Sequence, residues 1–426
     1  MLKFLMVSLI MIIMKTNHSK LLMSLMTIFY NMSLQTWSNS KMSYVFMGDL
    51  LSFWNTNLAI WMTLILMFVN TKEHELYKMV TILGLALFLM IFHSWSLLMF
   101  YMLFEMSMIM MLIIMMTWSY QPERVEAIMF LVVMALMFSL PFMAMMMKNI
   151  KTLNFWTMNL SLTLWEYLSI LGIFMMKMPF YFMHFWLPKV HVEAPVQGSM
   201  ILAAIMLKLG CYGMLRFSAV LSKFKTTNLM ILAMSMWSMV ILSMSCFIQS
   251  DIKTLIAYSS VVHMGIVLIT ILINKKKSIT ASMTIMLSHG MCASALFFLS
   301  NIFYTISKSR SITMNKGSAQ TLPMITIFWF AACMSNTPMP PAISMVGEIM
   351  SFKLILNFTN LYSIIFIMSL TSSLYSIFMF YIMIQGKSSK LTKKMFMMKI
   401  KTFVILNLHM IPLLFLSLKP KMLMII

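Results

Sequence analysis

Long apolar runs joined by short polar connections follow one another along the whole chain. Most runs are roughly 15–25 residues long, and about 20 apolar residues allow an α-helix to cross the hydrocarbon core of a bilayer. The pattern therefore predicts an all-α polytopic membrane protein with about fourteen transmembrane helices and no inserted soluble domain. The expected spans are residues 2–16, 20–35, 50–69, 78–93, 95–117, 123–147, 162–187, 196–217, 226–247, 252–273, 278–303, 322–357, 361–385 and 399–418.

Two of these predicted helices contain prolines that should interrupt them. Pro179 closely follows Lys177 in the seventh expected helix. The twelfth, which is too long for one straight span, contains Pro338, Pro340 and Pro341. Proline removes a backbone hydrogen bond and crowds the preceding turn. We therefore expect discontinuous helices near Met178–Pro179 and Pro338–Pro341, of the kind that line polar cavities in transporters.

The composition supports the membrane interpretation and narrows the partners. The chain is 61% hydrophobic and 10% charged, with a mean hydropathy of +0.92, which no water-soluble fold of this length requires. The net charge of +21 would suggest nucleic acid in a soluble protein. Here most lysines flank apolar runs, where they reach the membrane interface, so no nucleic-acid partner is expected. The four cysteines lie in apolar runs without a CxxC motif and are expected to be small buried side chains.

The methionine content carries information about the gene. Met accounts for 60 of 426 residues, mostly where Leu would serve equally well, while arginine is rare. This balance is typical of an AT-rich genome that reads ATA as Met. It therefore favours a mitochondrial gene of an invertebrate.

Charged side chains inside the apolar runs are few, and each is a candidate for function. Lys177 and Lys208 lie within such runs, and a lysine at the bilayer centre costs roughly 2.5–3.5 kcal/mol on insertion scales. Glu105 lies in the middle of the fifth run, and Glu348 lies two helical turns after Pro341. A carboxylate in such a position must be paired, protonated or in contact with water. The other acidic residues lie at helix ends or in loops, where solvent or a helix N-terminus accounts for them.

Two histidines lie inside predicted spans. His263 follows Ser259 by one helical turn, and His289 stands between Ser288 and Gly290. A single membrane histidine is often only a packing residue that is bonded to a neighbouring helix. Imidazole can both give and take a proton near neutral pH. Two histidines on adjacent helices, together with two buried lysines and two buried glutamates, therefore favour a relay.

Other buried or near-interface groups are weaker candidates. A lysine near a helix end reaches the interface, although Lys353 could instead extend the path toward a partner. His93, next to Trp95, is expected at the interface, and His409 is explained by packing. The two histidines in the joint between the seventh and eighth helices are either structural or gating. These candidates are Lys253, Lys353, His93, His184, His191 and His409.

Four segments carry a family resemblance. They are SYQPERVEA, LPKVHVEAPVQGSM, LKLGCYGMLRF and SDIKTLIAYSSVVHMG, in this order along the chain. Together they resemble the subunit 4 family of mitochondrial NADH:ubiquinone oxidoreductase, respiratory complex I, from about residue 95 to 385. The resemblance implies an antiporter-like fold with two inverted five-helix repeats, helices 4–8 (78–217) and 9–13 (226–385). Helices 1–3 (1–77) precede them, helix 14 (399–426) follows, and helices 7 and 12 are broken.

The resemblance also implies roles for the six buried groups. Glu105 would form an ion pair with Lys177. Lys208 would be the central lysine. His263 and His289 would be relay histidines, and Glu348 would be the terminal carboxylate. We expect Lys208, the two histidines and Glu348 to lie on one polar axis roughly parallel to the membrane plane.

The implied function is proton translocation across the inner mitochondrial membrane, coupled to NADH oxidation and ubiquinone reduction by other subunits. Flavin and iron–sulfur clusters are expected in those subunits, because this chain has no Cys cluster and no strand–GxGxxG–helix motif. No cofactor or metal is expected here. Expected partners are other complex I subunits, especially the antiporter-like subunits 2 and 5, and membrane lipids such as cardiolipin. A stand-alone cation/proton antiporter and a purely structural scaffold are the alternatives.

Overall fold

The structure is a computed structural model, and it describes residues 2–33, 41–42, 46–69, 75–148, 163–359, 362–386 and 399–418. The helices up to residue 221 are α1 (Leu2–Ile13), α2 (Thr16–Met32), α3 (Leu50–Val69), α4 (Glu75–His93), α5 (Leu97–Trp118), α6 (Arg124–Lys148), α7 (Leu164–Lys177), α8 (Trp186–Glu193), α9 (Val196–Ile201), α10 (Leu207–Arg216) and α11 (Ser218–Leu221). Those that follow are α12 (Lys225–Ser245), α13 (Ile252–Ile273), α14 (Lys276–Ser307), α15 (Ser318–Thr321), α16 (Pro323–Asn336), α17 (Ile343–Thr359), α18 (Tyr362–Ile384) and α19 (Ile400–Phe415).

Short elements complete the fold. A π-helical segment, Leu202–Met206, joins α9 to α10. Three single turns of 3₁₀ helix are Cys246–Ile248, Thr313–Asn315 and Leu416–Leu418. Strands β1 (Lys41–Met42) and β2 (Met47–Gly48) pair antiparallel, with Lys41 opposite Gly48.

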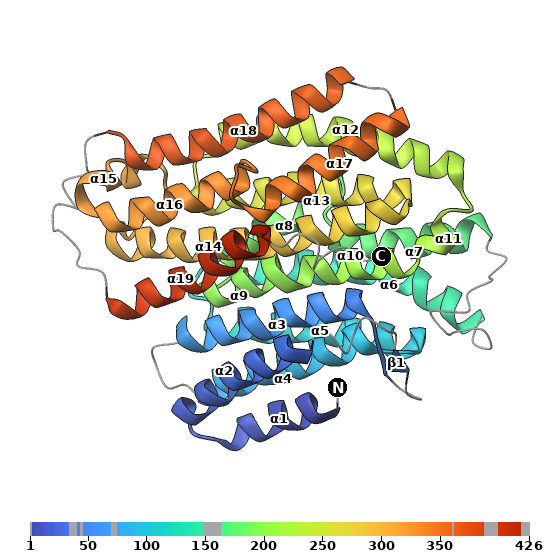
Figure 1. The fold of residues 1–426 in the computed structure, drawn as a ribbon, viewed down its shortest axis with the longest axis horizontal. Helices are drawn as coiled ribbons and strands as arrows, with labels where there is room; N and C mark the ends of the chain where they lie inside the picture. The colour runs from blue at the N-terminus through green and yellow to red at the C-terminus, as the bar shows by residue number, and fades with distance from the viewer. Residues whose placement is uncertain are drawn as a thin grey trace.

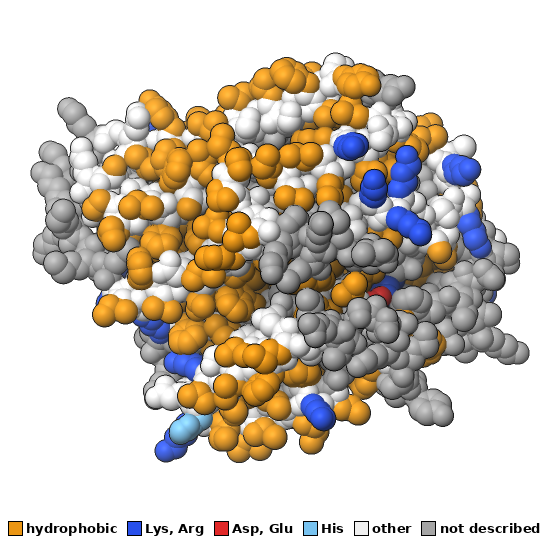
Figure 2. All heavy atoms as spheres, viewed as in Figure 1, with side chains coloured by type: hydrophobic (Ala, Val, Ile, Leu, Met, Phe, Trp, Pro, Cys, Tyr) orange, Lys and Arg blue, Asp and Glu red, His pale blue; other side chains and the backbone are white. Residues whose placement is uncertain are grey.

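The prediction of a polytopic all-α membrane protein is confirmed. Ten helices in the described part of the chain are long and apolar enough to cross a membrane. The helices run side by side across Figure 1, with α1–α5 below and α17 and α18 above. On the face shown in Figure 2, hydrophobic side chains cover the middle, and lysines and arginines gather mainly toward the two ends of the helices. This distribution is that of a lipid-facing belt between two polar interfaces.

The beginnings and ends of the helices follow local capping. Ser96 precedes α5, and its hydroxyl accepts a hydrogen bond from the amide of Met99. Thr163 and Glu166 form a capping box at the start of α7. At the end of α13, Asn274 adopts the left-handed conformation that commonly closes a helix. These signals agree with the predicted spans to within a few residues.

The innermost helices are those that carry the candidate polar groups. The span Val196–Arg216 and α14 are buried along their whole apolar windows, and α13 is 89% buried, whereas α6 is only 28% buried. A helix that is apolar all round is stable in the interior of a large bundle. Lys208, His289 and His263 therefore lie on helices that are surrounded by protein.

Both predicted interruptions are confirmed. α7 ends at Lys177, and α8 begins only at Trp186. The carbonyls that the break would leave free are covered: the Phe180 amide donates to Met175 O at 3.3 Å, and the Trp186 indole donates to Met176 O at 3.1 Å. Irregular backbone at membrane depth requires such partners, because lipid offers none.

The second interruption separates α16 from α17, between Asn336 and Ile343. Here the Ser344 hydroxyl donates to the carbonyl of Ser335 at 2.6 Å. The single long span expected for residues 322–357 is thus two helices, and Glu348 lies in the second turn of the latter. The break places a carboxylate next to reorganised backbone, as the prolines predicted.

A partly buried ion pair links one end of the Lys208 helix to the start of α3. Arg216, the last residue of α10, donates to both carboxylate oxygens of Asp49, at 2.6 and 2.8 Å, just before α3 begins. It also donates to the Tyr212 hydroxyl at 2.7 Å. Burial raises the pKa of the Asp49 carboxyl, but Arg216 and hydrogen bonds from Ser52 outweigh burial and hold this pKa below its usual value. The sequence analysis had treated Asp49 as an ordinary helix-end residue and missed this link.

Candidate functional site

Lys208 lies at the centre of the bundle and touches two polar groups. Its side chain is 1% exposed. The Nζ atom donates to the carbonyl of Ala203 at 2.6 Å and lies 2.9 Å from Nδ1 of His289. A lysine–imidazole contact of this length is a hydrogen bond through which one proton can be shared.

The π-helical segment before Lys208 explains its bond to Ala203. In this segment the backbone N–H groups reach back five residues, so that the amide of Leu207 donates to Leu202 O. The backbone around Ala203 is thereby shifted out of the regular α-helical register, and its carbonyl accepts from the lysine five residues later. π-Helical turns recur at functional sites. The apolar run itself gives no signal for this turn, and the sequence analysis did not predict it.

His289 and His263 continue the line of polar groups. Both are buried, on the adjacent helices α14 and α13, and their ring centroids are 5.6 Å apart. No hydrogen bond joins these two described rings, so a proton that passes between them needs a bridging water molecule or a ring rotation. The two histidines predicted from sequence are therefore neighbours in space.

His263 also contacts Glu348 and a residue that the sequence analysis missed. Its Nδ1 atom lies 3.2 Å from a carboxylate oxygen of Glu348 on α17, and its Nε2 atom lies 2.9 Å from the hydroxyl of Tyr375 on α18. Both partners are buried. Tyr375 was overlooked because a tyrosine inside an apolar run is usually a packing residue, and only the fold brings its hydroxyl to the imidazole.

Lys177 lies at the end of α7 with its amine inside protein. Its Nζ atom donates to Phe104 O at 3.1 Å and to the Ser107 hydroxyl at 3.3 Å, and it lies 3.2 Å above the Phe104 ring. A cation is attracted to the face of an aromatic ring, so all three contacts favour the charged amine. Beside it is a cavity of about 10 Å³ that reaches Leu202 and Met206 of the π-helical turn.

Glu105 lies next to this cluster on α5 and is half-buried. It interacts electrostatically with Lys177, but among the described residues no salt bridge joins the two side chains. The lysine instead bonds to Phe104 and Ser107 on the same helix. The structure thus brings together the two members of the predicted pair and leaves the pair open.

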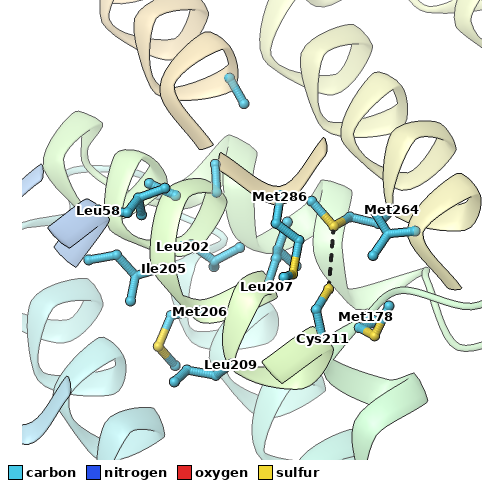
Figure 3. Close-up of a cluster of buried hydrophobic side chains, with 14 of the residues drawn as sticks. Leu58, Met178, Leu202, Ile205, Met206, Leu207, Leu209, Cys211, Met264 and Met286 are labelled. Atoms are coloured by element: carbon cyan, nitrogen blue, oxygen red, sulfur yellow. Dashed lines mark hydrogen bonds between the residues drawn. The ribbon is translucent and has the colours of Figure 1, made fainter. Parts of the chain in front are cut away.

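Figure 3 shows the apolar surroundings of the Lys208 helix. Leu207 and Cys211 of this span lie near Met286 of α14 and Met264 of α13, and the Cys211 thiol lies 3.8 Å from the Met264 sulfur. Such a lining keeps bulk water away and strengthens electrostatic interactions between the buried groups. Cys211 serves as a small buried side chain, as the sequence analysis expected.

The weaker candidates have different roles. The amine of Lys253 donates to the carbonyls of Val192 and Ala194, at 3.3 and 3.0 Å, at the end of α8. His191 is buried and stacks on Phe297, with centroids 4.5 Å apart. His409 bonds to the carbonyl of Ile405 within its own helix. The remaining three are Lys353, which is exposed, and His93 and His184, which are buried.

Gly210 allows the end of α7 to lie close to the helix that carries Lys208. Its replacement by alanine tests this close approach. A Cβ atom there would lie 3.1 Å from both the Met178 amide nitrogen and Cβ of Lys177. Because a backbone atom must move, we expect Gly210→Ala to shift Lys177 and to lower proton-coupled turnover severalfold in assembled protein. Gly84→Ala is the matched control, since there the added methyl meets only the flexible Met110 side chain. Equal turnover in the two variants would show that the close approach is not required.

The part of the chain covered by the structure contains no group of three or more His, Cys, Asp or Glu side chains that could hold a metal ion. The arrangement consists of titratable side chains. In order they are Glu105, Lys177, Lys208, His289, His263 and Glu348, with Tyr375 at His263.

Comparisons with known proteins agree with this arrangement. Residues 94–376 match the family model described as NADH:quinone oxidoreductase/Mrp antiporter, transmembrane. The protein named NADH-ubiquinone oxidoreductase chain 4 from Ceratitis capitata is 37% identical over 391 residues, which cover 88% of this chain and 87% of that one. The protein of the same name from Lumbricus terrestris is 34% identical over 394 residues, with the same coverage of the two chains.

Solved structures share the fold. A chain of respiratory complex I from Thermus thermophilus superposes with a TM-score of 0.87 at 18% identity, covering 98% of this chain and 96% of that one. A chain of an Mrp complex from a Dietzia species superposes with a TM-score of 0.81 at 17% identity, covering 97% of this chain and 49% of that one. At such identities the likeness concerns the fold.

Proposed function

This chain belongs to the family of NADH-ubiquinone oxidoreductase chain 4 proteins, and from this membership we propose how its buried charged groups move protons. It is a proton-translocating core membrane subunit of respiratory complex I. We place it in the mitochondrial inner membrane. We propose that Lys208, His289, His263 and Glu348 carry the proton across the bundle, and that Glu105 and Lys177 control its release.

The series of contacts at the bundle centre carries this proposal. Lys208 bonds to His289 at 2.9 Å, and His263 bonds to Glu348 at 3.2 Å. Each of the four groups lies on a different helix, so the series runs across the bundle and transverse to the helix axes (Figure 1). A scaffold held together by packing would not need four titratable groups in this order, because each buried charge costs several kcal/mol.

The proton would move in three steps. Protonated Lys208 passes a proton to Nδ1 of His289, which accepts it when the ring is neutral there. His289 then releases a proton from its other nitrogen toward His263, through water or a small ring rotation. His263 takes up this proton at Nε2, where the Tyr375 hydroxyl turns from donor to acceptor, and gives up its Nδ1 proton to Glu348.

The open pair of Glu105 and Lys177 would act as the control. When Glu105 swings onto Lys177, the two charges compensate each other and protonated Lys208 is tolerated. When the pair opens, as in this structure, the charged amine of Lys177 stays bonded to Phe104 and Ser107. Its charge then repels a charge on Lys208. This repulsion favours release of the Lys208 proton to His289.

The broader architecture follows the same reasoning. We infer two inverted five-helix repeats, residues 78–217 and 226–385, because each contains one interrupted helix next to a key titratable group. We also infer fourteen crossings, by counting α1, α2, α7 and α16 with α17 in addition to the ten long apolar spans. Antiporter-like subunits 2 and 5 are the proposed neighbours. Flavin and iron–sulfur clusters are proposed for other subunits, and no cofactor is proposed for this one.

Tyr375 gives a direct test of the His263 position. Tyr375→Phe keeps the ring and removes the hydroxyl that lies 2.9 Å from His263 Nε2. A hydrogen bond is worth about 1 kcal/mol, so we expect proton-coupled turnover to fall about fivefold with a changed pH profile. Tyr381→Phe, at an exposed position of the same helix, is the control. An unchanged rate and pH profile in the Tyr375 variant would remove this residue from the path.

A further inference from the structure

Exposed lysines gather at one end of the bundle. They are Lys225, Lys275, Lys276, Lys277 and Lys353, and together we call them the lysine patch. The first begins α12, the next three lie at the start of α14, and the last lies in the final two turns of α17. Figure 2 shows lysines and arginines gathered over the right-hand ends of α12, α13 and α17, as these helices are placed in Figure 1.

The packing of α17 on α14 places Lys353 beside the start of α14. A Cβ atom at Gly347 would lie 2.7 Å from the Thr284 hydroxyl oxygen, so the two helices touch there. They run in opposite directions (Figure 1). With a rise of about 1.5 Å per residue, Lys353 lies roughly 9 Å beyond Gly347, and Lys277 lies roughly 10 Å from Thr284 in the same direction. The two lysines therefore reach the same level.

The start of α12 is held at the same end of the bundle. Asn274, in the turn between α13 and α14, donates through its amide to the carbonyl of Ser218 at 2.9 Å. Ser218 begins the short helix α11, which leads into α12. Neither α12 nor α14 has an acidic residue in its first turn. Because a helix N-terminus carries a partial positive charge, these two helix ends add to the charge of the lysines and do not offset it.

The lysine patch takes part in no salt bridge among the described residues. Elsewhere in this part of the chain, salt bridges join Lys148 to Glu166, Lys189 to Glu126, Arg216 to Asp49 and Arg310 to Glu193. From residue 194 to residue 347 the sequence contains one acidic residue, Asp251, which lies at the opposite end of α13 from the patch. The patch is therefore a concentration of positive charge that attracts anions from outside the chain.

Exposed apolar side chains lie next to the lysines, toward the middle of the bundle. Ile349 precedes Lys353 by about one helical turn and is 54% exposed. On α12, Leu229 and Met230 follow Lys225 by about one turn and are 49% and 71% exposed. A change from lysine to exposed apolar side chains marks the boundary between headgroups and acyl chains in a membrane. A phospholipid has the same order of parts, whereas an acidic protein segment would match the lysines alone.

We propose that the lysine patch binds anionic phospholipids in preference to zwitterionic ones. Their phosphates lie next to the lysines, and their acyl chains lie against the exposed apolar side chains of α12 and α17. Each lysine near an anionic headgroup strengthens binding by about fivefold. A zwitterionic headgroup carries its own cation beside the phosphate and gains less. The site lies outside the proton relay, so the test of the site does not depend on the test of the relay.

The experiment uses the intact complex in vesicles of phosphatidylcholine that contain a minor share of phosphatidylglycerol. In one sample the phosphatidylglycerol carries a photoreactive diazirine near its headgroup, and in the other the phosphatidylcholine carries it. Labelled peptides are quantified by mass spectrometry after illumination. We expect the ratio of anionic to zwitterionic labelling at the lysine patch to exceed the same ratio at Met137, an exposed residue of α6, by at least about fivefold. Concentrated salt should reduce this preference, since the Debye length falls from about 10 Å at 0.1 M to about 3 Å at 1 M.

Charge variants sharpen the test. Lys276→Gln together with Lys277→Gln removes two charges and keeps long polar side chains, and we expect the preference to fall at least about fivefold. Lys276→Arg together with Lys277→Arg keeps the charge and should keep the preference. The matched control is Lys308→Gln with Lys316→Gln, which changes two exposed lysines that follow α14. Digestion with chymotrypsin gives comparable peptides in every variant, because this protease does not cut at lysine.

Three results would overturn the proposal. One is an equal labelling ratio at the lysine patch and at Met137 in the unaltered complex, a comparison that stands even if a variant fails to assemble. Another is an undiminished preference in the assembled glutamine variant. The third is a carbodiimide cross-link from a patch lysine to an acidic residue of a neighbouring subunit, which would make the patch a protein interface.

Discussion

Lys208→Met is expected to reduce NADH-driven proton pumping by at least about tenfold, because methionine keeps much of the volume and removes the only titratable group of this side chain. Lys208 is 1% exposed and bonds to His289 at 2.9 Å, so no other group takes over its place in the series. Coupled NADH:quinone turnover should fall as well, since a tightly coupled pump cannot pass its electrons freely. NADH oxidation by an artificial electron acceptor should survive, because we propose the flavin for another subunit.

The control for Lys208 is Lys225→Met, which removes an exposed lysine at the start of α12 and should leave every rate unchanged. Assembly of the complex is checked first by native electrophoresis. Proton pumping is then measured in sealed vesicles by the quenching of a pH-sensitive dye. Normal coupled pumping by fully assembled Lys208→Met complex would show that Lys208 is not on the proton path.

Glu105→Gln is expected to have an effect of similar size through a different cause. Glutamine keeps the shape of the side chain and removes the charge that interacts with Lys177. Lys177 is 3% exposed, so little water is present to screen its charge once the Glu105 charge is gone. The pair could then no longer close, so we expect proton release from Lys208 to lose its control and coupled turnover to fall at least about tenfold.

Glu126→Gln is the matched control for Glu105. Glu126 lies on α6 and pairs with Lys189 at 3.1 Å, but its side chain is 60% exposed, and surface pairs of this kind contribute little. Pumping and turnover are compared in the two variants at equal content of assembled complex. If Glu105→Gln pumped as well as Glu126→Gln, the switch between open and closed pair would be excluded.

Much of the site could be predicted because a buried charge stands out in an apolar sequence. Placing a charged side chain in a membrane is costly, so the presence of such a residue in an apolar run indicates a functional role. This holds for Lys177, Lys208, Glu105 and Glu348. The prolines after Lys177 and before Glu348 predicted the interrupted helices, because proline lacks the N–H that donates the helical hydrogen bond. The length of the apolar runs predicted the helices, because the bilayer sets how many apolar residues a span needs.

Neutral and short-range features could not be predicted. Tyr375 and Ser107 have polar groups that are ordinary inside apolar helices, and only the packing of α18 on α13 and of α7 on α5 gives them partners. The π-helical turn at Leu202–Met206 depends on one extra residue in a turn and leaves no compositional trace. The link between Arg216 and Asp49 joins residues far apart in the chain.

The sequence by itself determined that this chain is a membrane bundle with interrupted helices and six titratable groups inside it, because lipid penalises every charge and every open backbone group wherever they occur. Only the tertiary structure decided how these groups meet. The contacts of Lys208 with His289 and of His263 with Glu348 arise between helices. The pair of Glu105 and Lys177 is open because the Lys177 amine bonds to Phe104. Proton transfer depends on separations of a few ångströms, and these are set by helix packing and not by the pattern along the chain.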